Sequence, residues 1–442
     1  MKKLLTALLA LGIVFSLAAC SSDKGGDSLT EADMKSADRV KEGTIEIYAP
    51  AGKNTDYLIG AMELYNKEFG TNLVLNPVDV APADPMVQKV TPMLVANEKM
   101  PELIFLQDAN AGAIFSKFQD SFYSSEDLGF VAEHGSKFYD AKMNMLANIA
   151  PNGKTFGFPN DWGNSAMFYN DAEFKKAGVN MEDVKTWDDL IEAGKLLKEA
   201  TGRKLLFMRD TGELDLVYYL TEQQGVSLLD KDGNLNLTNP AVVKSYEIIQ
   251  RLIDEDLVAF GPSADYAKIG QASGVGFYGG WMASYQAGDF PDDAGDIRIA
   301  AMPAVIEGEP IAPMSGGSSF YVLKNSENAT AAYQFISYAL TNMESLEGYM
   351  NIMGFPANKE AYKTDAAQRE FPYYGNQKIL VTLDEISQQS IKGFVFPYSA
   401  DLRTYVEQAS NDIQYNGMPV EEALKKHAEE FAQKYDIKVN EQ

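Results

Sequence analysis

The sequence predicts an α/β fold divided into two lobes, and three observations support this prediction. Apolar residues at strand spacing are followed by apolar residues at helical spacing over residues 44–106. A second series of such signals begins near residue 159. The chain has 442 residues, more than one hydrophobic core usually organises. Strand–helix alternation is typical of a parallel sheet with helices packed around it, so we expect one such unit in each lobe.

The first lobe is predicted to begin with three strands separated by two helices. The strands are expected at 44–49, 73–78 and 103–106, and the helices at 58–69 and 86–96. In parallel sheets, ligands usually bind beyond the carboxyl ends of the strands. Polar residues that directly follow these strands are therefore candidate site residues.

The rest of the chain carries its own element signals. Thr186 is expected to cap a helix that Gly202 ends, and Asp232-Gly233 to form a hairpin turn. Further helices are expected at 242–253, 331–340 and 420–435, and further strands at 204–208, 275–278, 297–301 and 318–323. We find no internal repeat among these elements.

The first twenty residues have the features of a processing signal. Basic Lys2 and Lys3 precede an apolar stretch at 4–17 that is too short to span a membrane. Small residues then lead to Cys20, as in bacterial lipoproteins, where this cysteine is lipidated. We therefore predict a lipoprotein signal peptide at 1–20 and a lipid anchor on Cys20. An ordinary secretory signal is the alternative.

The segment that follows Cys20 is predicted to be a flexible tether. Residues 21–43 are polar, with almost no large apolar side chains, so they cannot bury enough surface to order themselves. Cys20 is also the only cysteine, which excludes an intramolecular disulfide and a cysteine-built metal or redox site.

Composition and motif content argue against several classes of function. The formal net charge of −25 disfavours nucleic acid and anionic lipid headgroups as partners. His134 and His427 are far apart, and we expect His427 on the outer face of the last helix, so neither a histidine metal centre nor a Ser–His pair is expected. Phosphate-loop and nucleophile-elbow motifs are absent from the sequence. We expect no cofactor, no metal and no nucleic acid.

A series of short motifs resembles a known family. They include a proline–acid–apolar strand, a glycine–tryptophan turn and segments that cross between lobes. They lie at 101–105, 153–159, 168–170, 186–190, 279–281, 315–318 and 324–326. Each motif is weak alone, but their shared order over most of the chain is specific. The chain is similar to the family 1 extracellular solute-binding proteins, the group that includes maltodextrin-binding protein.

The resemblance implies a type II periplasmic-binding-protein-like fold, in which two hinge-connected α/β lobes enclose a ligand cleft. Lobe 1 would comprise 44–158 and 304–362, and lobe 2 would comprise 159–303 and 363–442. The crossings between lobes would lie near 158–161, near 302–303 and after 362.

The resemblance also implies a function. Such a protein captures a sugar or oligosaccharide by hinge closure and delivers it to the permease subunits of an ABC importer. We expect a monomer without enzyme activity, anchored at the extracellular face of the cell membrane. The maltodextrin-binding protein has an acidic residue in the first crossing, whereas Gly163 falls at about that place here. This difference argues against maltose as the ligand.

Trp281 is the strongest candidate site residue. It follows two glycines at the end of a predicted strand and matches the family tryptophan that stacks on a sugar ring. A core position is the alternative. Asp161, Trp162 and Asn164 at the first crossing would add one ring and two polar groups. Hinge packing is the alternative for Trp162, and Trp187 is expected only to pack its helix onto the lobe.

The other candidates lie at strand ends or in loops that the family uses for ligand contacts. They are Lys53, Asn54, Gln107, Asp108, Arg209, Asp210, Gly316, Gly317, Tyr398 and Arg403. Helix capping is the alternative for Asn54, and a solvated loop tip is the alternative for Gln107 and Asp108. The glycines would let backbone approach a ligand closely, or simply form a turn.

Three other functions stay open. Adjacent tyrosines at Tyr218-Tyr219 and Tyr373-Tyr374 could bind ferric ion in a binding protein of the same fold. A surface glycosidase would need two carboxylates across a scissile bond, and no local pattern selects such a pair. A partner of a membrane sensor cannot be distinguished from a transport subunit by sequence.

Overall fold

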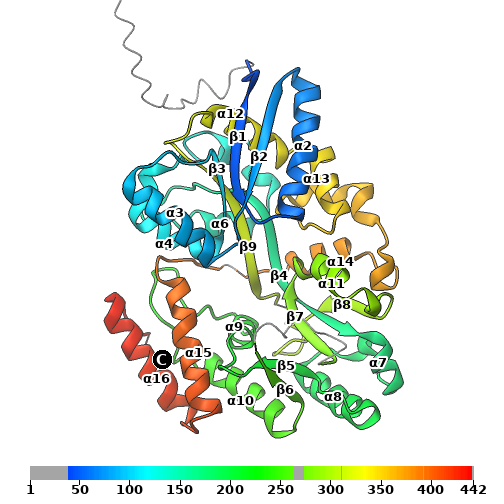
Figure 1. Ribbon diagram of the computed structural model, residues 1–442. Helices are drawn as coiled ribbons and strands as arrows, with labels where there is room; N and C mark the ends of the chain where they lie inside the picture. The colour runs from blue at the N-terminus through cyan, green and yellow to red at the C-terminus, as the bar shows by residue number, and fades with distance from the viewer. Residues whose placement is uncertain (1–37, 263–272, 310, 392, 441–442) are drawn as a thin grey trace, which may run out of the picture.

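The computed structural model describes residues 38–262, 273–309, 311–391 and 393–440 (Figure 1). The predicted signal peptide, Cys20 and most of the predicted tether lie outside the described residues. Among the helices within these ranges, none is long and apolar enough to cross a membrane.

A seven-stranded mixed sheet forms the centre of the molecule. Its strands are β1 (Glu42–Ala49), β2 (Asn72–Asp79), β3 (Leu103–Gln107), β4 (Phe158–Asn170), β7 (Val275–Gly279), β8 (Ile297–Ala301) and β9 (Met314–Val322). The order is β2-β1-β3-β9-β4-β7, and β8 pairs with β4. β1 pairs in parallel with β2 and β3, as predicted, whereas β9 and β4 make only antiparallel pairs.

Helices surround β1, β2 and β3 in the upper half of Figure 1. They are α2 (Lys53–Phe69), α3 (Asp84–Ala96), α4 (Asp108–Phe118), α5 (Phe130–His134), α6 (Asp140–Leu146), α12 (Ala329–Ala339) and α13 (Met343–Asn351). Ile45 and Ile47 of β1 are fully buried in the core that these helices close. This arrangement confirms the predicted α/β pattern of the first part of the chain.

A second group of elements forms the lower half of Figure 1. It contains a parallel pair, β5 (Leu206–Arg209) and β6 (Val258–Gly261), with α7 (Asp171–Lys176), α8 (Trp187–Thr201), α9 (Asp215–Glu222), α10 (Pro240–Asp254), α15 (Ser399–Gln414) and α16 (Val420–Tyr435). Thr186 caps α8 through a capping box with Asp189, and Gly202 ends the helix in the left-handed conformation, as predicted. Leu229 and Leu235 pair across the predicted hairpin.

The strands β4 and β9 connect the two halves. The first residues of β4 pair with β9, and its later residues pair with β7 and β8. The β4–β9 register shifts between Pro159 and Asp161 and again between Trp162 and Asn164. Such irregularities bend a strand and increase its twist. They lie where the first crossing between lobes was predicted.

The buried side chains form two cores that match the two halves. One core gathers around β1, β3 and β9, and the other gathers around β5, α8, α9, α10 and α16. The helix α14 (Ile379–Ser387) contributes Ile379, Leu380 and Leu383 to the first core, although we assigned segment 363–442 to lobe 2. The proposed boundaries between lobes stay a prediction.

Two local expectations are wrong. His427 was expected on the outer face of the last helix, but it is buried between α16 and α15, where its Nε2 lies 2.9 Å from Asp412 Oδ2. Asn54 does not cap α2, because the N-cap is Gly52 and Asn54 lies inside the helix. The burial of His427 arises from the packing of α16 against the preceding helix, whereas the cap of α2 is a local difference of two residues.

Candidate functional site

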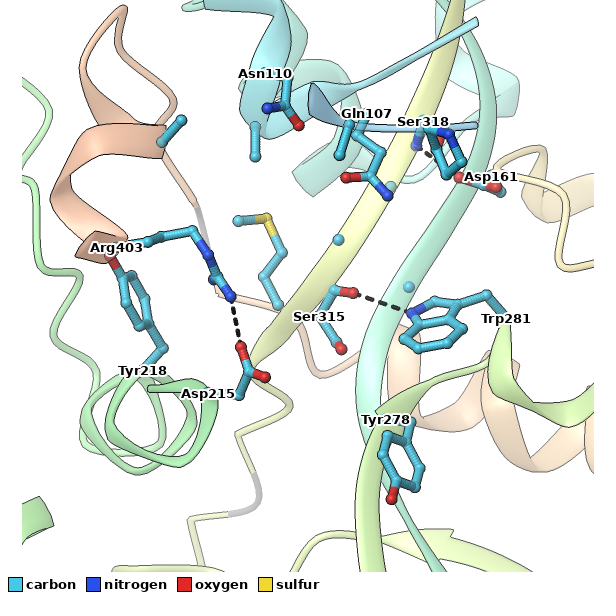
Figure 2. Close-up of a pocket in the computed structure, with 18 of the residues that line it drawn as sticks. Gln107, Asn110, Asp161, Asp215, Tyr218, Tyr278, Trp281, Ser315, Ser318 and Arg403 are labelled. Atoms are coloured by element: carbon cyan, nitrogen blue, oxygen red, sulfur yellow. Dashed lines mark hydrogen bonds and ion pairs between the residues drawn. The ribbon is translucent and has the colours of Figure 1, made fainter. Parts of the chain in front are cut away.

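A cavity of about 950 Å³ lies between the two halves (Figure 2). Its lining comes from the start of α2, the β3–α4 junction, β4, α9, the β7–α11 turn, β9 and α15. The helix α11 (Met282–Asp289) follows β7 directly. In Figure 2, Gln107 and Asn110 lie on one wall, Asp215 and Arg403 on a second and Trp281 on a third. The cavity is concave and mixed in polarity, as small-molecule sites usually are.

Ten of the predicted site residues line this cavity. They are Lys53, Asn54, Gln107, Asp161, Trp162, Arg209, Trp281, Gly316, Gly317 and Arg403. Their positions in the chain range from α2 to α15. The fold therefore brings together most of the residues that the strand ends and the family motifs had selected.

Trp281 lies at the turn between β7 and α11. Its indole Nε1 donates to the carbonyl oxygen of Ser315 at 3.4 Å. The ring makes edge contacts with Tyr278 and Tyr285, with centroid separations of 6.3 and 6.2 Å. Trp281 is partly buried, packing against the first core on one side and lining the cavity on the other. Such a ring can cover the apolar face of a sugar.

Lys53 joins the start of α2 to the turn that holds Trp281. Its Nζ donates to the carbonyl oxygen of Trp281 at 2.8 Å and to Ser284 Oγ at 2.9 Å. Burial lowers the pKa of Lys53 to about 8, and the nearby Asp161 opposes this shift. Lys53 thus places a hydrogen-bond donor beside the ring of Trp281, which we call the aromatic platform.

Asp161 and Trp162 lie in the irregular part of β4. Asp161 Oδ1 accepts from the backbone N–H of Ser318 at 2.6 Å, and burial raises the pKa of this carboxyl, partly offset by Lys142. Trp162 is 3% exposed and its Nε1 donates to Ser390 Oγ at 3.2 Å. Trp162 therefore both packs the hinge region and contributes to the cavity wall.

A chain of charges forms the opposite wall. Asp215 at the start of α9 pairs with Arg209 and with Arg403, whose Nη2 lies 2.6 Å from Asp215 Oδ1. Arg403 also lies over the ring of Tyr218, 5.5 Å from its centroid. Burial alone would lower the pKa of Arg403, but Asp215 raises it. The guanidinium keeps further N–H donors for hydroxyl oxygens.

Four predicted site residues do not line the cavity. Asp108 is buried against Lys142 and accepts from Ser319 Oγ at 2.9 Å. Asn164 donates to the carbonyl oxygen of Ala312 at 3.0 Å. Asp210 is exposed on the surface, and Tyr398 donates to the carbonyl oxygen of Gly233 at 2.8 Å. The structure therefore gives three of them other partners, and their place in the site stays a prediction.

Several cavity residues escaped the sequence analysis. They are Asp215 and Glu222 on α9, and Asn110, Tyr285 and Ser315 elsewhere. Tyr218 and Tyr219 of α9 also line the cavity, but the sequence suggested them only as iron ligands. The helix α9 is short, and its continuous apolar and aromatic run from Leu216 to Leu220 gives no local sign that one face borders a cleft. The position after β5 was a usable signal, since ligands gather at strand ends.

The contacts of the tyrosine pairs disfavour an iron site. The hydroxyls of Tyr373 and Tyr374 donate to backbone carbonyls of Phe290 and Ala283. Tyr218 lines the cavity, but burial raises its pKa and so disfavours the tyrosinate that ferric ion needs. Within the described residues, no group of three or more His, Cys, Asp or Glu side chains could hold a metal ion.

Two α/β halves, crossing strands and an interposed cleft define the type II periplasmic-binding-protein-like fold. The family model for bacterial extracellular solute-binding proteins matches residues 61–372, more than half of the chain. The chain belongs to this family. The family and its relatives are binding proteins that work outside the cytoplasm.

Individual relatives are sugar-binding proteins. The chain is 26% identical over 370 residues to an arabinooligosaccharide-binding protein of Bacillus subtilis (strain 168), covering 80% of each chain. It is 27% identical to a lactose-binding protein of Rhizobium radiobacter, covering 90% of this chain and 94% of the relative. An ABC transporter associated binding protein of B. animalis subsp. lactis Bl-04, solved with β-1,6-galactobiose, matches 91% of this chain and 100% of its own at 24% identity, with a TM-score of 0.71.

Proposed function

We propose that this protein is the lipid-anchored capture subunit of an ABC importer and that its solute is an oligosaccharide. The observation that carries this proposal is the cavity between the two halves, where a partly buried tryptophan faces hydrogen-bonding and charged side chains. The sugars named for the relatives above support the same ligand class. The cavity volume of about 950 Å³ favours several sugar units over one.

The proposed cycle is a population shift. A sugar that contacts both halves stabilises the closed state, because only that state makes all the contacts. Trp281 would cover an apolar sugar face, while Lys53, Gln107 and Arg403 would bond to hydroxyls. The importer's permease subunits would then recognise the closed form.

Calorimetric titration with arabinotriose, lactose and β-1,6-galactobiose tests the ligand class. We expect saturable one-site binding of at least one of these sugars and a smaller radius of gyration in small-angle scattering when it is bound. Chromatography after long incubation should return the sugar unchanged, whereas cleavage products would favour the glycosidase alternative. A tyrosinate charge-transfer band on addition of ferric ion, with no heat from any sugar, would replace the proposal.

The proposed lipid anchor on Cys20 can be tested separately from sugar binding. We expect Cys20→Ala to move the protein from the membrane fraction to the culture medium, because the thiol that carries the lipid is lost. Sugar affinity should be unchanged, since the residues that line the cavity all lie at position 50 or later in the chain. Fractionation of cells that express the native chain and the variant gives the answer, and a variant that stays in membranes contradicts the anchor.

A further inference from the structure

Two side chains join helix α9 to the first residues of β9. Glu222 Oε2 accepts from the backbone N–H of Met314 at 2.7 Å, and Tyr219 Oη lies 2.7 Å from Ser315 Oγ. We call this pair of bonds the α9 clasp. The Ser315 carbonyl oxygen also accepts from Trp281 Nε1. The clasp therefore connects one wall of the cavity to a crossing strand and, through Ser315, to the aromatic platform.

Glu222 is an unusual member of the cavity lining. Its side chain faces the cavity yet is only 4% exposed. Burial raises its pKa to about 7, and the hydrogen bond from Met314 opposes this shift only in part. The pKa of the carboxyl group therefore lies near neutral pH, where small changes in its surroundings change its charge.

The charged groups around Glu222 do not stabilise its ionised form. On α9, Asp215 is paired with two arginines and Tyr218 is buried. From α15, Arg403 is held by Asp215. The strand β9 contains no charged residue, and the exposed Lys244 of α10 pairs with Glu247. The charge of Glu222 therefore depends mainly on how much water reaches it.

We propose that Glu222 couples solute capture to proton uptake by its carboxylate. This inference rests on the proposed function and names a regulation of the same site. Closure over a solute removes water from the cavity, and loss of water disfavours the carboxylate relative to the neutral acid. The proton can reside on Oε1 while Oε2 keeps the bond from Met314, so the α9 clasp survives protonation.

The expected sign follows from linkage. Because closure raises the proton affinity of Glu222, the closed state binds more protons, and affinity for the solute increases as pH falls from 8 to 6. Closure would also bury Lys53 further, which would release a proton and give the opposite sign. Further burial of Asp161 on closure would cause proton uptake, as for Glu222. A variant at position 222 is therefore required to identify the contribution of Glu222.

The first experiment needs no ligand. Urea unfolding of the native protein and of Glu222→Gln is measured from pH 5 to pH 8. The folded pKa of about 7 lies above the ordinary value of 4.5, so the native protein should lose stability relative to Glu222→Gln as pH rises. The amide introduced by Glu222→Gln keeps an oxygen that can accept from Met314, which preserves the α9 clasp. A difference that does not change with pH overturns the proposal.

The second experiment is calorimetry with arabinotriose at pH 7 in two buffers of different ionisation enthalpy. We expect net proton uptake on binding by the native protein and an affinity several-fold higher at pH 6 than at pH 8. Glu222→Gln should take up clearly less proton and show a smaller pH dependence than the native protein, because only the contributions of Asp161 and Lys53 remain. Glu213→Gln is the matched control, because burial also raises the pKa of Glu213 to about 7 but this residue does not line the large cavity.

Each outcome of the second experiment decides a different point. Proton uptake that is equal in the native protein and in Glu222→Gln overturns the proposal and leaves the proposed function standing. Uptake that is reduced in Glu222→Gln and kept in Glu213→Gln supports it. If arabinotriose gives no heat with the native protein at any pH, lactose and β-1,6-galactobiose are titrated in the same way. Absence of binding by all three sugars overturns the proposed function and this inference with it.

Discussion

Replacement of Lys142 by methionine is expected to destabilise the protein by about 3–5 kcal/mol, because it leaves a buried carboxylate without its counter-charge. Lys142 on α6 is fully buried and bonds to Asp108 and to the carbonyl oxygen of Ser318 on β9. Asp108 in turn accepts from Ser319 on the same strand. Urea unfolding at pH 7 measures the loss.

An exposed ion pair provides the matched control. Lys154 and Asp127 also form a lysine–aspartate pair, but their side chains are 46% and 55% exposed. Lys154→Met should therefore cost less than about 1 kcal/mol. The double variant Lys142→Met, Asp108→Leu should recover much of the lost stability, since an apolar pair of similar volume avoids the unpaired charge. A Lys142→Met variant as stable as Lys154→Met would contradict the account.

The same ion pair explains why Asp108 does not line the cavity, although the sequence predicted that it would. It directly follows β3, where polar residues often meet a ligand. Its partner Lys142 lies 34 positions later, on a seven-residue helix with no recognisable partner motif. Gly317 approaches so closely that a Cβ there would lie 2.9 Å from Asp108 Oδ2. Such long-range contacts leave no local pattern in one sequence.

Local physics, in contrast, predicted much of the fold. The Thr186 cap and the Gly202 stop are confirmed, because capping involves only neighbouring residues. The helix ending at Tyr435 was also placed correctly, but its buried face was not. His427 is buried because Asp412, on the preceding helix, offers it a partner. The orientation of a helix thus depends on contacts that its own periodicity only partly encodes.

The cavity residues that lie in family motifs or at strand ends were predicted from the sequence. Trp281, Lys53 and Gln107 line the cavity as expected. Glu222 was missed, and Tyr218 was suggested only as an iron ligand, because both face the cavity through the way α9 packs beside β9 and α10. Their burial and raised pKa values arise from that packing, so a sequence without an alignment gives no sign of them.

Trp281→Ala should weaken sugar binding by about 2 kcal/mol, roughly 30-fold, while it changes stability little. The ring would lose its contact with the sugar face, but it is only partly buried and borders the cavity. Its hydrogen bond to Ser315 is long, at 3.4 Å, so little stability depends on it. Calorimetry and thermal unfolding on the same preparation measure both quantities.

Trp187→Ala is the matched control with the opposite expected pattern. Trp187 is 3% exposed, its Nε1 donates to Gln223 at 2.9 Å, and its ring packs against Phe277. Its removal should cost about 3–5 kcal/mol of stability, because it leaves a cavity in the second core. Below the melting transition, affinity should stay near the native value, since Trp187 does not line the ligand cavity. If Trp281→Ala melts as early as Trp187→Ala and binds normally when folded, Trp281 is a core residue and the aromatic platform must lie elsewhere.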